Sequence, residues 1–424
     1  MTERFIYQNN EPISDDVIRE NLKAMLDERA PLKKVLLIPP DLTRMNSYAG
    51  PITRMLFEML PDAQVDILPA LGSHMPMEPE ELHEMFGDIP LDRFLVHNWR
   101  TDVECIGTIP ASFVEEISEG RVHNDVPVEV NRRILDKSHD LILSIGQVVP
   151  HEVVGMANFN KNIFVGCGGL GMISNSHMLG AIYGMERMMG RDNTPVHRLF
   201  DYAEAHFLQA VPLVYVLTVV SNTRNYQAVN SLAIGRSRSL FSRSIEVSQK
   251  NNLNFLDHSM KKIVAYLDPK EFRTTWVGNK SVYRTRMAIA DGGELIVLAP
   301  GLRRCGEDME NDALIRRYGY VGRDRVLELF KTDPVLRNAA SVAAHLIHGS
   351  SNGRFSITYA PGFMTKEEIE SLNFKYMPLT EALAKYNPET LKDGLNIVDG
   401  EEVYFISNPA VGLWADRERF NSNN

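Results

Sequence analysis

Residues 141–180 read LILSIGQVVPHEVVGMANFNKNIFVGCGGLGMISNSHMLG, and this stretch decides how the chain is interpreted. It opens with a short apolar run that predicts a buried strand over 140–145. Three side chains able to move protons, form covalent bonds or bind metals then follow, amid many Gly and Asn residues: His151, Lys161 and His177. We therefore expect a strand that leads into loops carrying most of the chemistry.

Similar units precede this stretch along the chain. Apolar runs of strand length occur at 35–38, 65–68 and 94–97, and they alternate with helical spacing at 15–29, 51–60 and 79–85. Alternating strands and helices predict an α/β fold with a doubly wound, mainly parallel sheet. The first two strands end at Asp41, Thr43 and Arg44 and at His74, where ligands bind in such sheets.

A chain of 424 residues exceeds one typical hydrophobic core, so we expect two α/β domains. Further helices are predicted at 195–211 and 253–267, and a strand at 213–222. Asp268 and Pro269 mark the predicted boundary between an N-terminal domain, 1–268, and a smaller C-terminal α/β domain, 269–424. The second domain is predicted to contain strands at 294–299 and 355–359 and helices at 323–331, 335–348 and 379–386.

Composition excludes several classes of protein. The formal net charge of −10 argues against a general nucleic-acid-binding surface. The three cysteines have no CxxC spacing, which favours a reducing cytoplasm over a disulfide framework. No apolar run reaches the roughly 18 to 20 residues that span a bilayer, so we expect neither a membrane nor a secreted protein.

The candidate functional residues each have a structural alternative. His74, His151 and His177 are predicted in loops rather than on apolar stripes, which favours a functional role. Lys161 is followed by a strand-like run and is either a solvated lysine or an amine that forms a covalent bond or contacts a phosphate. The sequence GCGGLG, 166–171, either approaches a phosphate or forms a turn.

Two other groups of residues each have two possible roles. Arg284, Arg286, Arg303 and Arg304 either bind a carboxylate or phosphate or form a solvated basic face. His345 and His348 lie one helical turn apart, but no third metal ligand is evident, so a structural role is favoured. The absence of GxSxG and HExxH motifs argues against a serine hydrolase and a zinc protease.

Four blocks of sequence resemble the lactate racemase family, nickel-pincer enzymes with two α/β domains that interconvert stereoisomers of 2-hydroxy acids. They are DLTR at 41–44, ALGSHMPM at 70–77, PHEVVGMANFNK at 150–161 and NSH at 175–177. The resemblance implies that Lys161 is covalently attached to the nickel-pincer nucleotide and that His177 binds its nickel. It also implies that His74 and His151 are the acid/base pair and that Asp41, Leu42, Thr43 and Arg44 line the cofactor.

The mechanism implied by this resemblance is proton-coupled hydride transfer. One histidine takes the hydroxyl proton while the cofactor takes hydride from C2, which leaves a 2-oxo acid, and the second histidine completes the return. The N-terminal domain would hold the cofactor and the C-terminal domain would close the cleft over it. The implied partners are a small 2-hydroxy acid and the cofactor-making enzymes, with no nucleic acid or membrane, and the chain would be compatible with an oligomer.

The chain departs from the family pattern at several positions. Met75 stands where an arginine is frequent, and residues 156–160 replace a Gly-rich run. In the second domain the substrate region contains Lys280, Tyr283, Arg284 and Arg286, which would suit a larger hydroxy acid such as a sugar acid, so an aldonate 2-epimerase is the alternative within the family. A non-catalytic ligand-binding or sensing protein on the same fold is the alternative from another class.

Overall fold

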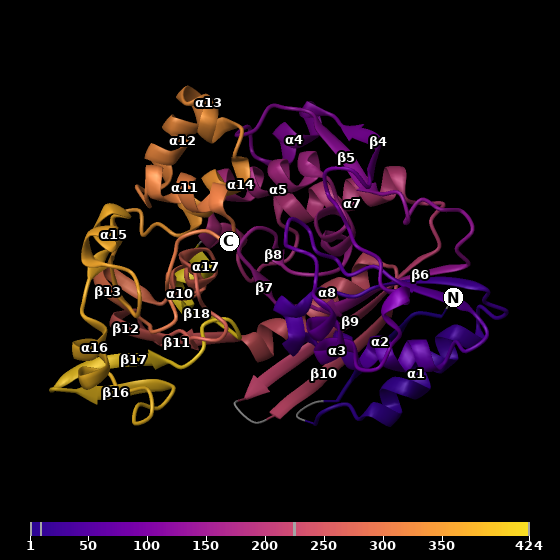
Figure 1. Cartoon of the computed structure of the whole chain (residues 1–424), viewed down its shortest axis with the longest axis horizontal. Helices are drawn as coiled ribbons and strands as arrows, with labels where there is room; N and C mark the ends of the chain where they lie inside the picture. The colour runs from indigo at the N-terminus through magenta and orange to yellow at the C-terminus, as the bar shows by residue number, and fades with distance from the viewer. Residues whose placement is uncertain (1, 9–10, 224–225, 423–424) are drawn as a thin grey trace. The chain divides into compact units, whose positions relative to one another are not determined.

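The computed structural model describes residues 2–8, 11–223 and 226–422 (Figure 1). These described residues divide into two compact units, each treated separately below. The first comprises residues 1–183 and 188–252, and the second comprises residues 184–187 and 253–424. The predicted boundary at 268/269 therefore lies inside the second unit, because the strand that precedes it belongs to the second sheet.

The first unit is built on a sheet with strand order β1-β10-β9-β6-β2-β3. Strands β2, β3, β6 and β9 are parallel, whereas β10 and β1 add an antiparallel edge. This arrangement confirms the predicted doubly wound, mainly parallel fold. The strands span Arg4–Tyr7 (β1), Lys34–Ile38 (β2), Gln64–Ile67 (β3), Leu141–Gln147 (β6), Leu213–Thr223 (β9) and Tyr226–Gly235 (β10).

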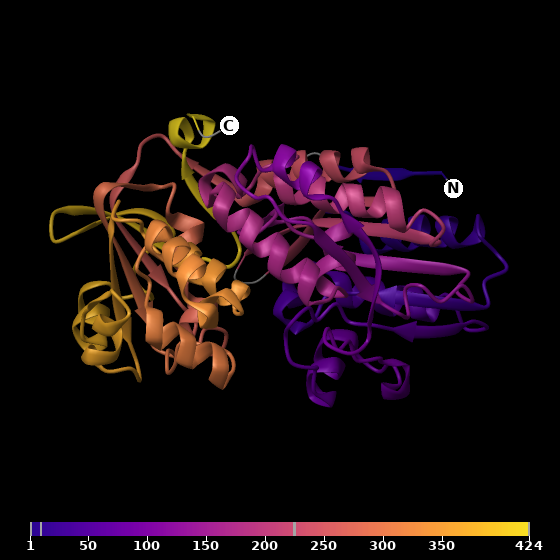
Figure 2. The same cartoon turned by 90° about the horizontal axis from the view of Figure 1, so that it is seen from above.

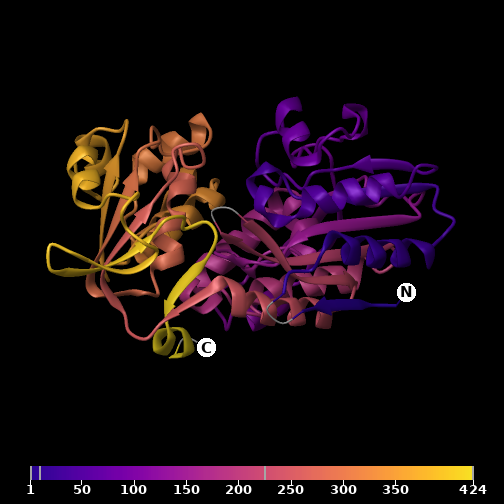
Figure 3. The same cartoon turned by 90° about the horizontal axis from the view of Figure 1, so that it is seen from below.

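Helices cover both faces of this sheet (Figures 2 and 3). One face carries a core in which alternate residues of the strands pack against α1, α2 and α3. Helix α8 packs on β9 and β10. Burying apolar side chains from each strand and each helix supplies the main stabilising free energy. The helices of this unit span Asp15–Asp27 (α1), Ala49–Glu58 (α2), Pro79–Phe86 (α3), Ala111–Ile117 (α4), Leu170–Tyr183 (α5), Pro195–Phe207 (α7) and Arg238–Asn252 (α8), whereas most of the short helix Met185–Met188 (α6) lies in the second unit.

Smaller elements complete the first unit. Strands β4 (Val103–Ile109) and β5 (Val126–Asn131) form an antiparallel pair, as do β7 (Pro150–His151) and β8 (Gly155–Met156). Short helices are η1 (Leu42–Ser47), η2 (Leu91–Arg93) and η3 (Asn162–Gly166). The strand predicted at 94–97 is wrong, because only Phe94 bridges to Ile67 and the residues before it form η2.

The second unit has its own sheet, with order β15-β14-β13-β12-β17-β16, and a separate parallel pair, β11 and β18. The helix predicted over 253–267 is wrong. These residues form β11 and β12 because Ile263, Val264 and Ala265 are buried between β13 and β17. The strands span Leu253–Leu256 (β11), Met260–Tyr266 (β12), Ile289–Ala299 (β13), Ser356–Pro361 (β14), Lys375–Tyr376 (β15), Gly394–Val398 (β16), Glu401–Ile406 (β17) and Leu413–Asp416 (β18).

Helix α16 packs over one side of this second sheet, where Ala382 and Tyr386 meet apolar side chains of β12, β13, β14 and β17. The helix predicted over 335–348 is interrupted, since α13 ends at Arg337 and α14 begins at Ala340. The helices span Thr275–Gly278 (α9), Lys280–Thr285 (α10), Met309–Tyr318 (α11), Arg323–Thr332 (α12), Pro334–Arg337 (α13), Ala340–His348 (α14), Lys366–Ser371 (α15), Leu379–Lys385 (α16) and Arg417–Ser422 (α17).

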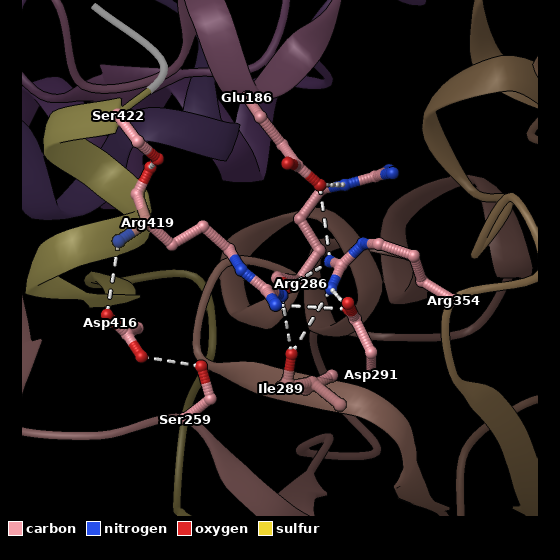
Figure 4. A network of polar contacts seen from close by, with 9 residues as sticks. All are labelled: Glu186, Ser259, Arg286, Ile289, Asp291, Arg354, Asp416, Arg419 and Ser422. Atoms are coloured by element: carbon pink, nitrogen blue, oxygen red, sulfur yellow. Dashed lines mark hydrogen bonds and ion pairs between the residues drawn. The ribbon is translucent and has the colours of Figure 1, made fainter.

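Residues 184–187 belong to the second unit although the chain on either side belongs to the first. A polar network holds them (Figure 4). Arg286 Nε and Arg354 Nη2 donate to Glu186 Oε1 at 3.1 and 3.2 Å, and Arg354 also bonds Asp291 at 2.8 Å. Because the Arg286 side chain is only 4% exposed, its charge needs this carboxylate partner. Glu186 thus holds residues 184–187 within the second unit.

None of the helices in the described part of the chain combines the length and apolar character needed to span a bilayer.

The thiols of Cys105, Cys167 and Cys305 are all free, and burial raises the pKa of the Cys305 thiol to about 12.

Candidate active site

Three neighbouring strands of the first sheet, in the order β6-β2-β3, end at the same edge and lead directly to candidate residues. Asp41 follows β2, His74 follows β3 and His151 follows β6. A parallel bridge between Pro40 and Ala70 continues the β2–β3 pairing beyond the strands. Neighbouring parallel strands therefore deliver these three side chains to one edge, as predicted for a ligand site in such a sheet.

Asp41 and His74 form the most direct pair in the site. Nδ1 of His74 lies 2.5 Å from Oδ2 of Asp41, and Thr43 Oγ1 donates to Oδ1 of the same carboxylate at 2.5 Å. Burial alone would raise the pKa of Asp41, but the charge and hydrogen bond of His74, the hydrogen bond of Thr43 and the charge of Arg44 outweigh it, so the pKa is lowered. The carboxylate is therefore ionised at neutral pH.

His151 is held by its local backbone. It forms the short antiparallel pair β7–β8 with Gly155, and the backbone N–H of Val153 donates to its Nδ1 at 3.1 Å. The Glu152 carboxylate lies 3.8 Å from the same nitrogen. His151 is buried, whereas His74 is about half exposed, so the two imidazoles occupy different environments.

Lys161 lies at a tight turn rather than at the start of the predicted strand. Asn158 and Phe159 have positive φ angles of 71° and 54°, and the apolar run after Lys161 forms the helix η3. The side-chain amide of Asn162 donates to Ile38 O and Ser144 Oγ, both at 3.1 Å, which ties this turn to the end of β2 and to the middle of β6. These buried hydrogen bonds favour the helical turn over a strand.

The amine of Lys161 is poorly hydrated although part of its side chain remains exposed. Desolvation by burial, reinforced by the charge of Arg44, lowers its pKa to about 8, against the opposing charges of Glu152 and Asp41. A lysine with a lowered pKa holds more neutral amine near pH 7, which is the nucleophilic form. The local environment thus suits covalent chemistry.

His177 lies on helix α5 and not in a loop as predicted. Its Nδ1–H donates to the carbonyl of Ile173, one turn earlier, at 2.6 Å. This bond leaves the lone pair on Nε2, the arrangement that metal-binding histidines adopt. Burial lowers the pKa of His177 to about 4, so the ring is neutral at pH 7. Gly180 lets α5 approach the carbonyl of Val153, beside His151, because a Cβ there would lie 2.5 Å from that oxygen.

Two carboxylates couple all four candidate side chains. Asp41 bonds His74 and acts electrostatically on Lys161, while Glu152 lies beside His151 and acts on both Lys161 and His177. In addition, Gly72 N–H donates to Gly166 O at 2.8 Å, which joins the His74 loop to η3. The structure therefore brings His74, His151, Lys161 and His177 into one cluster within the first unit.

The other residues of the first unit that were predicted to be functional lie partly in the hydrophobic core and partly near the site. Leu42 packs against the hydrophobic core, whereas Arg44 acts electrostatically on both Asp41 and Lys161. In the run 166–171, the amide of Gly171 donates to Glu129 Oε2 at 2.7 Å. A protein carboxylate thus binds where a phosphate was one alternative, so these glycines serve close packing.

The substrate residues predicted in the second unit are mostly buried within it. Tyr283 and Arg284 are 4% and 1% exposed, and Arg284 donates to the carbonyl of Gly412 at 3.2 Å. Arg286 is committed to Glu186 in the network of Figure 4. Lys280 is partly exposed and lies 3.9 Å from the Glu271 carboxylate. Arg284 and Arg286 thus have partners within the second unit, and contact of the four residues with a substrate stays a prediction.

The structure gives different environments to four other candidate residues: Arg303, Arg304, His345 and His348. Arg303 and Arg304 are exposed, whereas His345 is buried, stacks on Trp276 and bonds Tyr320 at 2.8 Å. His348 is buried as well. In the described ranges, no group of three or more His, Cys, Asp or Glu side chains is arranged to hold a metal ion. His345 and His348 are accordingly buried residues in surroundings that suit a structural role.

A depression of about 450 Å³ lies elsewhere on the first unit, where it is lined by residues that include Asn131, Arg132 and Arg133. It contains none of the candidate residues. The cluster of His74, His151, Lys161 and His177 is therefore defined by its contacts and charges.

Sequence reasoning missed two features of this site. The role of Glu152 as the shared neighbour of His151, Lys161 and His177 was not predicted, although its position beside His151 was a signal. The direct bond between Asp41 and His74 was also missed, because the two residues are 33 positions apart and meet only when β2 and β3 pair.

Replacing Lys161 with methionine is expected to raise the free energy of unfolding at pH 7 by about 1 kcal/mol, after discounting for partial exposure. The folded chain holds this proton more weakly than the unfolded chain, since the pKa falls from 10.5 to about 8. The charged Lys161 therefore lowers the free energy of unfolding of the wild-type protein by the full amount below pH 8. This destabilisation disappears as the pH rises toward 10.5. Urea unfolding at pH 7, 8.5 and 10 measures it, with the exposed Lys137→Met as control. A difference that does not change with pH would show that the amine is well hydrated.

Comparisons with known proteins identify a family model for the first part of the chain and related folds for most of it. Residues 10–190 match the family model described as the lactate racemase N-terminal domain. A crystal structure of a protein from Thermotoga maritima is similar over 96% of this chain and 99% of its own, with a TM-score of 0.82 and 22% identity. The lactate racemase apoprotein from Thermoanaerobacterium thermosaccharolyticum is similar over 95% and 93%, with a TM-score of 0.70 and 19% identity.

The sequence matches no curated protein. The two structural similarities show the fold alone, whereas the family model identifies the part of the chain that carries the cluster, since His74, His151, Lys161 and His177 all lie within residues 10–190. Residues 10–190 are therefore similar to the N-terminal domain of the lactate racemase family.

Proposed function

We propose that this protein is a racemase or epimerase that inverts C2 of a 2-hydroxy acid. The match of residues 10–190 to the lactate racemase N-terminal domain supports a racemase or epimerase function. The observation that carries the proposal is the cluster itself, in which Asp41 and Glu152 link His74, His151, Lys161 and His177. Inversion needs two proton-transfer groups and a means of activating an unreactive C–H bond, and two histidines supply the first requirement.

The residues present fit the nickel-pincer nucleotide that we propose as cofactor. Lys161 offers an amine whose pKa is lowered to about 8, which suits a covalent attachment. His177 offers one neutral imidazole with its lone pair on Nε2, which suits a nickel ligand. A metal held mainly by its own organic ligand needs only one protein side chain. When bound, this group would supply the acceptor for the hydrogen at C2.

The other side chains move protons and place charge. Nε2 of His74 accepts the hydroxyl proton of the substrate, and the ionised Asp41 stabilises the imidazolium that results. His151 is the second proton-transfer group, and its burial limits exchange with water. Arg44 adds positive charge near Lys161, which favours an anionic group there, such as a phosphate.

The residues predicted to contact the substrate bear on which 2-hydroxy acid this protein uses. Lys280, Tyr283, Arg284 and Arg286 suggested a sugar acid as the alternative substrate, and Tyr283, Arg284 and Arg286 are buried. Lys280 is the member of this group that keeps partial exposure. We therefore propose a 2-hydroxy acid without restricting it to an aldonate, and we compare small and large substrates directly.

The test is to produce the protein together with cofactor-making enzymes and to analyse it by mass spectrometry and metal analysis. An adduct on Lys161 with bound nickel is expected, followed by loss of optical activity with lactate, malate or gluconate. Absence of the adduct under conditions that load a known lactate racemase would contradict the proposal. A loaded protein inactive on all three acids, and unaffected in ligand binding by His74→Ala, would favour the non-catalytic alternative.

A further inference from the structure

We infer that Asp41 is a positioning residue that holds the imidazole of His74 with its proton on Nδ1 and its lone pair on Nε2. The resemblance to lactate racemases implied instead that Asp41 lines the cofactor. This inference rests on the proposed function for its kinetic consequence, but its structural content concerns the protein alone.

Both oxygens of the Asp41 carboxylate are engaged by the protein. Oδ2 faces Nδ1 of His74 at 2.5 Å, and Oδ1 accepts from Thr43 at 2.5 Å. The Asp41 side chain is only 7% exposed. The backbone is fixed as well, because Arg44 N–H donates to Asp41 O at 3.0 Å and Leu42 packs into the core. Asp41 therefore has little freedom to turn away from His74.

The charge around Asp41 determines which atom carries the proton. The positive groups that act on it are His74 and Arg44, and Lys161 is influenced by it in turn. An ionised carboxylate only accepts hydrogen bonds, so Nδ1 of His74 must be the donor. A carboxylate so placed would also repel a phosphate, which argues against the role implied by the resemblance.

His151 provides a contrast within the same site. The backbone N–H of Val153 donates to its Nδ1, so in the neutral ring the proton lies on Nε2. The Glu152 carboxylate, 3.8 Å from Nδ1, is the charged group beside it and is beyond hydrogen-bond distance. In their neutral forms the two histidines thus have opposite tautomers, in which His74 has a proton acceptor at Nε2 and His151 has a donor there.

Asp41→Asn is the informative variant because Thr43 orients the new side chain. The Thr43 hydroxyl continues to donate to the remaining oxygen, which turns the amide NH₂ toward Nδ1 of His74. That NH₂ donates, so the proton of His74 moves to Nε2 and the acceptor is lost. An equivalent change in a Ser-His-Asp triad lowers kcat about 10⁴-fold. We expect a loss of roughly 10² to 10⁴-fold in kcat, the range of acid–base catalysis, with little change in KM.

The direct measurement is a two-bond ¹H–¹⁵N spectrum of protein labelled at histidine, with signals assigned by His74→Gln and His151→Gln. In the wild-type protein, Nδ1–H is expected for His74 and Nε2–H for His151. In Asp41→Asn the His74 signal should change to Nε2–H, whereas Asp41→Glu should retain Nδ1–H and recover part of kcat. The matched control is Asp88→Asn, since Asp88 lies 3.6 Å from Nδ1 of His83 in an exposed pair.

The outcomes separate this inference from the proposed function. A wild-type His74 with Nε2–H, or an Asp41→Asn variant with an unchanged tautomer, would overturn the inference even if the loaded enzyme is active. A protein that never acquires the Lys161 adduct would refute the proposed function, whereas the tautomers measured without cofactor would still test the role of Asp41. If the tautomer changes but kcat does not, the positioning has no kinetic role and the inference fails.

Discussion

Replacing Lys161 with alanine is expected to abolish both the covalent adduct and the catalytic activity. No other lysine is placed as Lys161 is, on a turn tied to β2 and β6 by Asn162 and near both Asp41 and Glu152 in the described residues. Without an acceptor for the C2 hydrogen, the reaction returns to its uncatalysed rate, a loss of at least about 10⁶-fold. Intact-mass spectrometry and polarimetry on protein produced with cofactor-making enzymes measure the two effects.

Lys161→Arg sharpens this experiment because it retains positive charge but offers no neutral amine at pH 7. It is expected to be as inactive as Lys161→Ala. Lys137→Ala removes an exposed lysine from the same unit and should leave the adduct and the rate unchanged. Activity in Lys161→Arg, or an adduct at another lysine, would contradict the proposed attachment.

His177→Ala is expected to separate attachment from metal binding. The adduct on Lys161 should form, since His177 lies on α5 and Lys161 on the turn before η3. Bound nickel should be lost, because even residues that only orient a ligand typically change metal affinity 10 to 100-fold, and a direct ligand costs at least about that much. Activity is then expected to fall to background. Metal analysis together with intact-mass spectrometry distinguishes this result from misfolding.

The chain offers a matched control for this variant. His206 lies on α7 in the same unit, and its Nδ1 donates to the Tyr202 carbonyl one turn earlier, at 2.8 Å, as His177 does to Ile173. His206 is exposed and remote from the pairs that define the site. His206→Ala should therefore retain nickel and activity. Full nickel content in His177→Ala would rule out His177 as the protein ligand.

The fold was predictable where local pattern and tertiary environment agree. The buried runs of β2, β3 and β6 follow from their apolar residues, and the helices α1 and α3 follow from their spacing and from caps such as Ser14, whose side chain accepts from Val17 N–H. Prediction failed where the pairing of a segment with neighbouring strands decides its secondary structure. Met260–Tyr266 was assigned to a helix, but its position between β13 and β17 makes it a central strand.

The site was predictable only in part for a related reason. His74, His151, Lys161 and His177 were identified from residue type and the resemblance. The partners of each side chain were not, because they come from other parts of the chain. Arg286 illustrates this: its loop-like sequence suggested a ligand, yet its partner Glu186 lies 100 residues earlier. A charged residue cannot be classed as binding or structural until its counter-ion is known.

The anchoring of residues 184–187 also has a consequence for the order of events during synthesis. Glu186 leaves the ribosome 100 residues before Arg286 and 168 before Arg354. At typical translation rates of 5–20 residues per second, Glu186 waits about 5 to 20 s for Arg286. All residues of the first unit, which ends at residue 252, have been synthesised before this counter-ion exists. A nascent chain stalled before residue 286 therefore contains the whole candidate site, whereas Glu186 still lacks the arginines that pair with it.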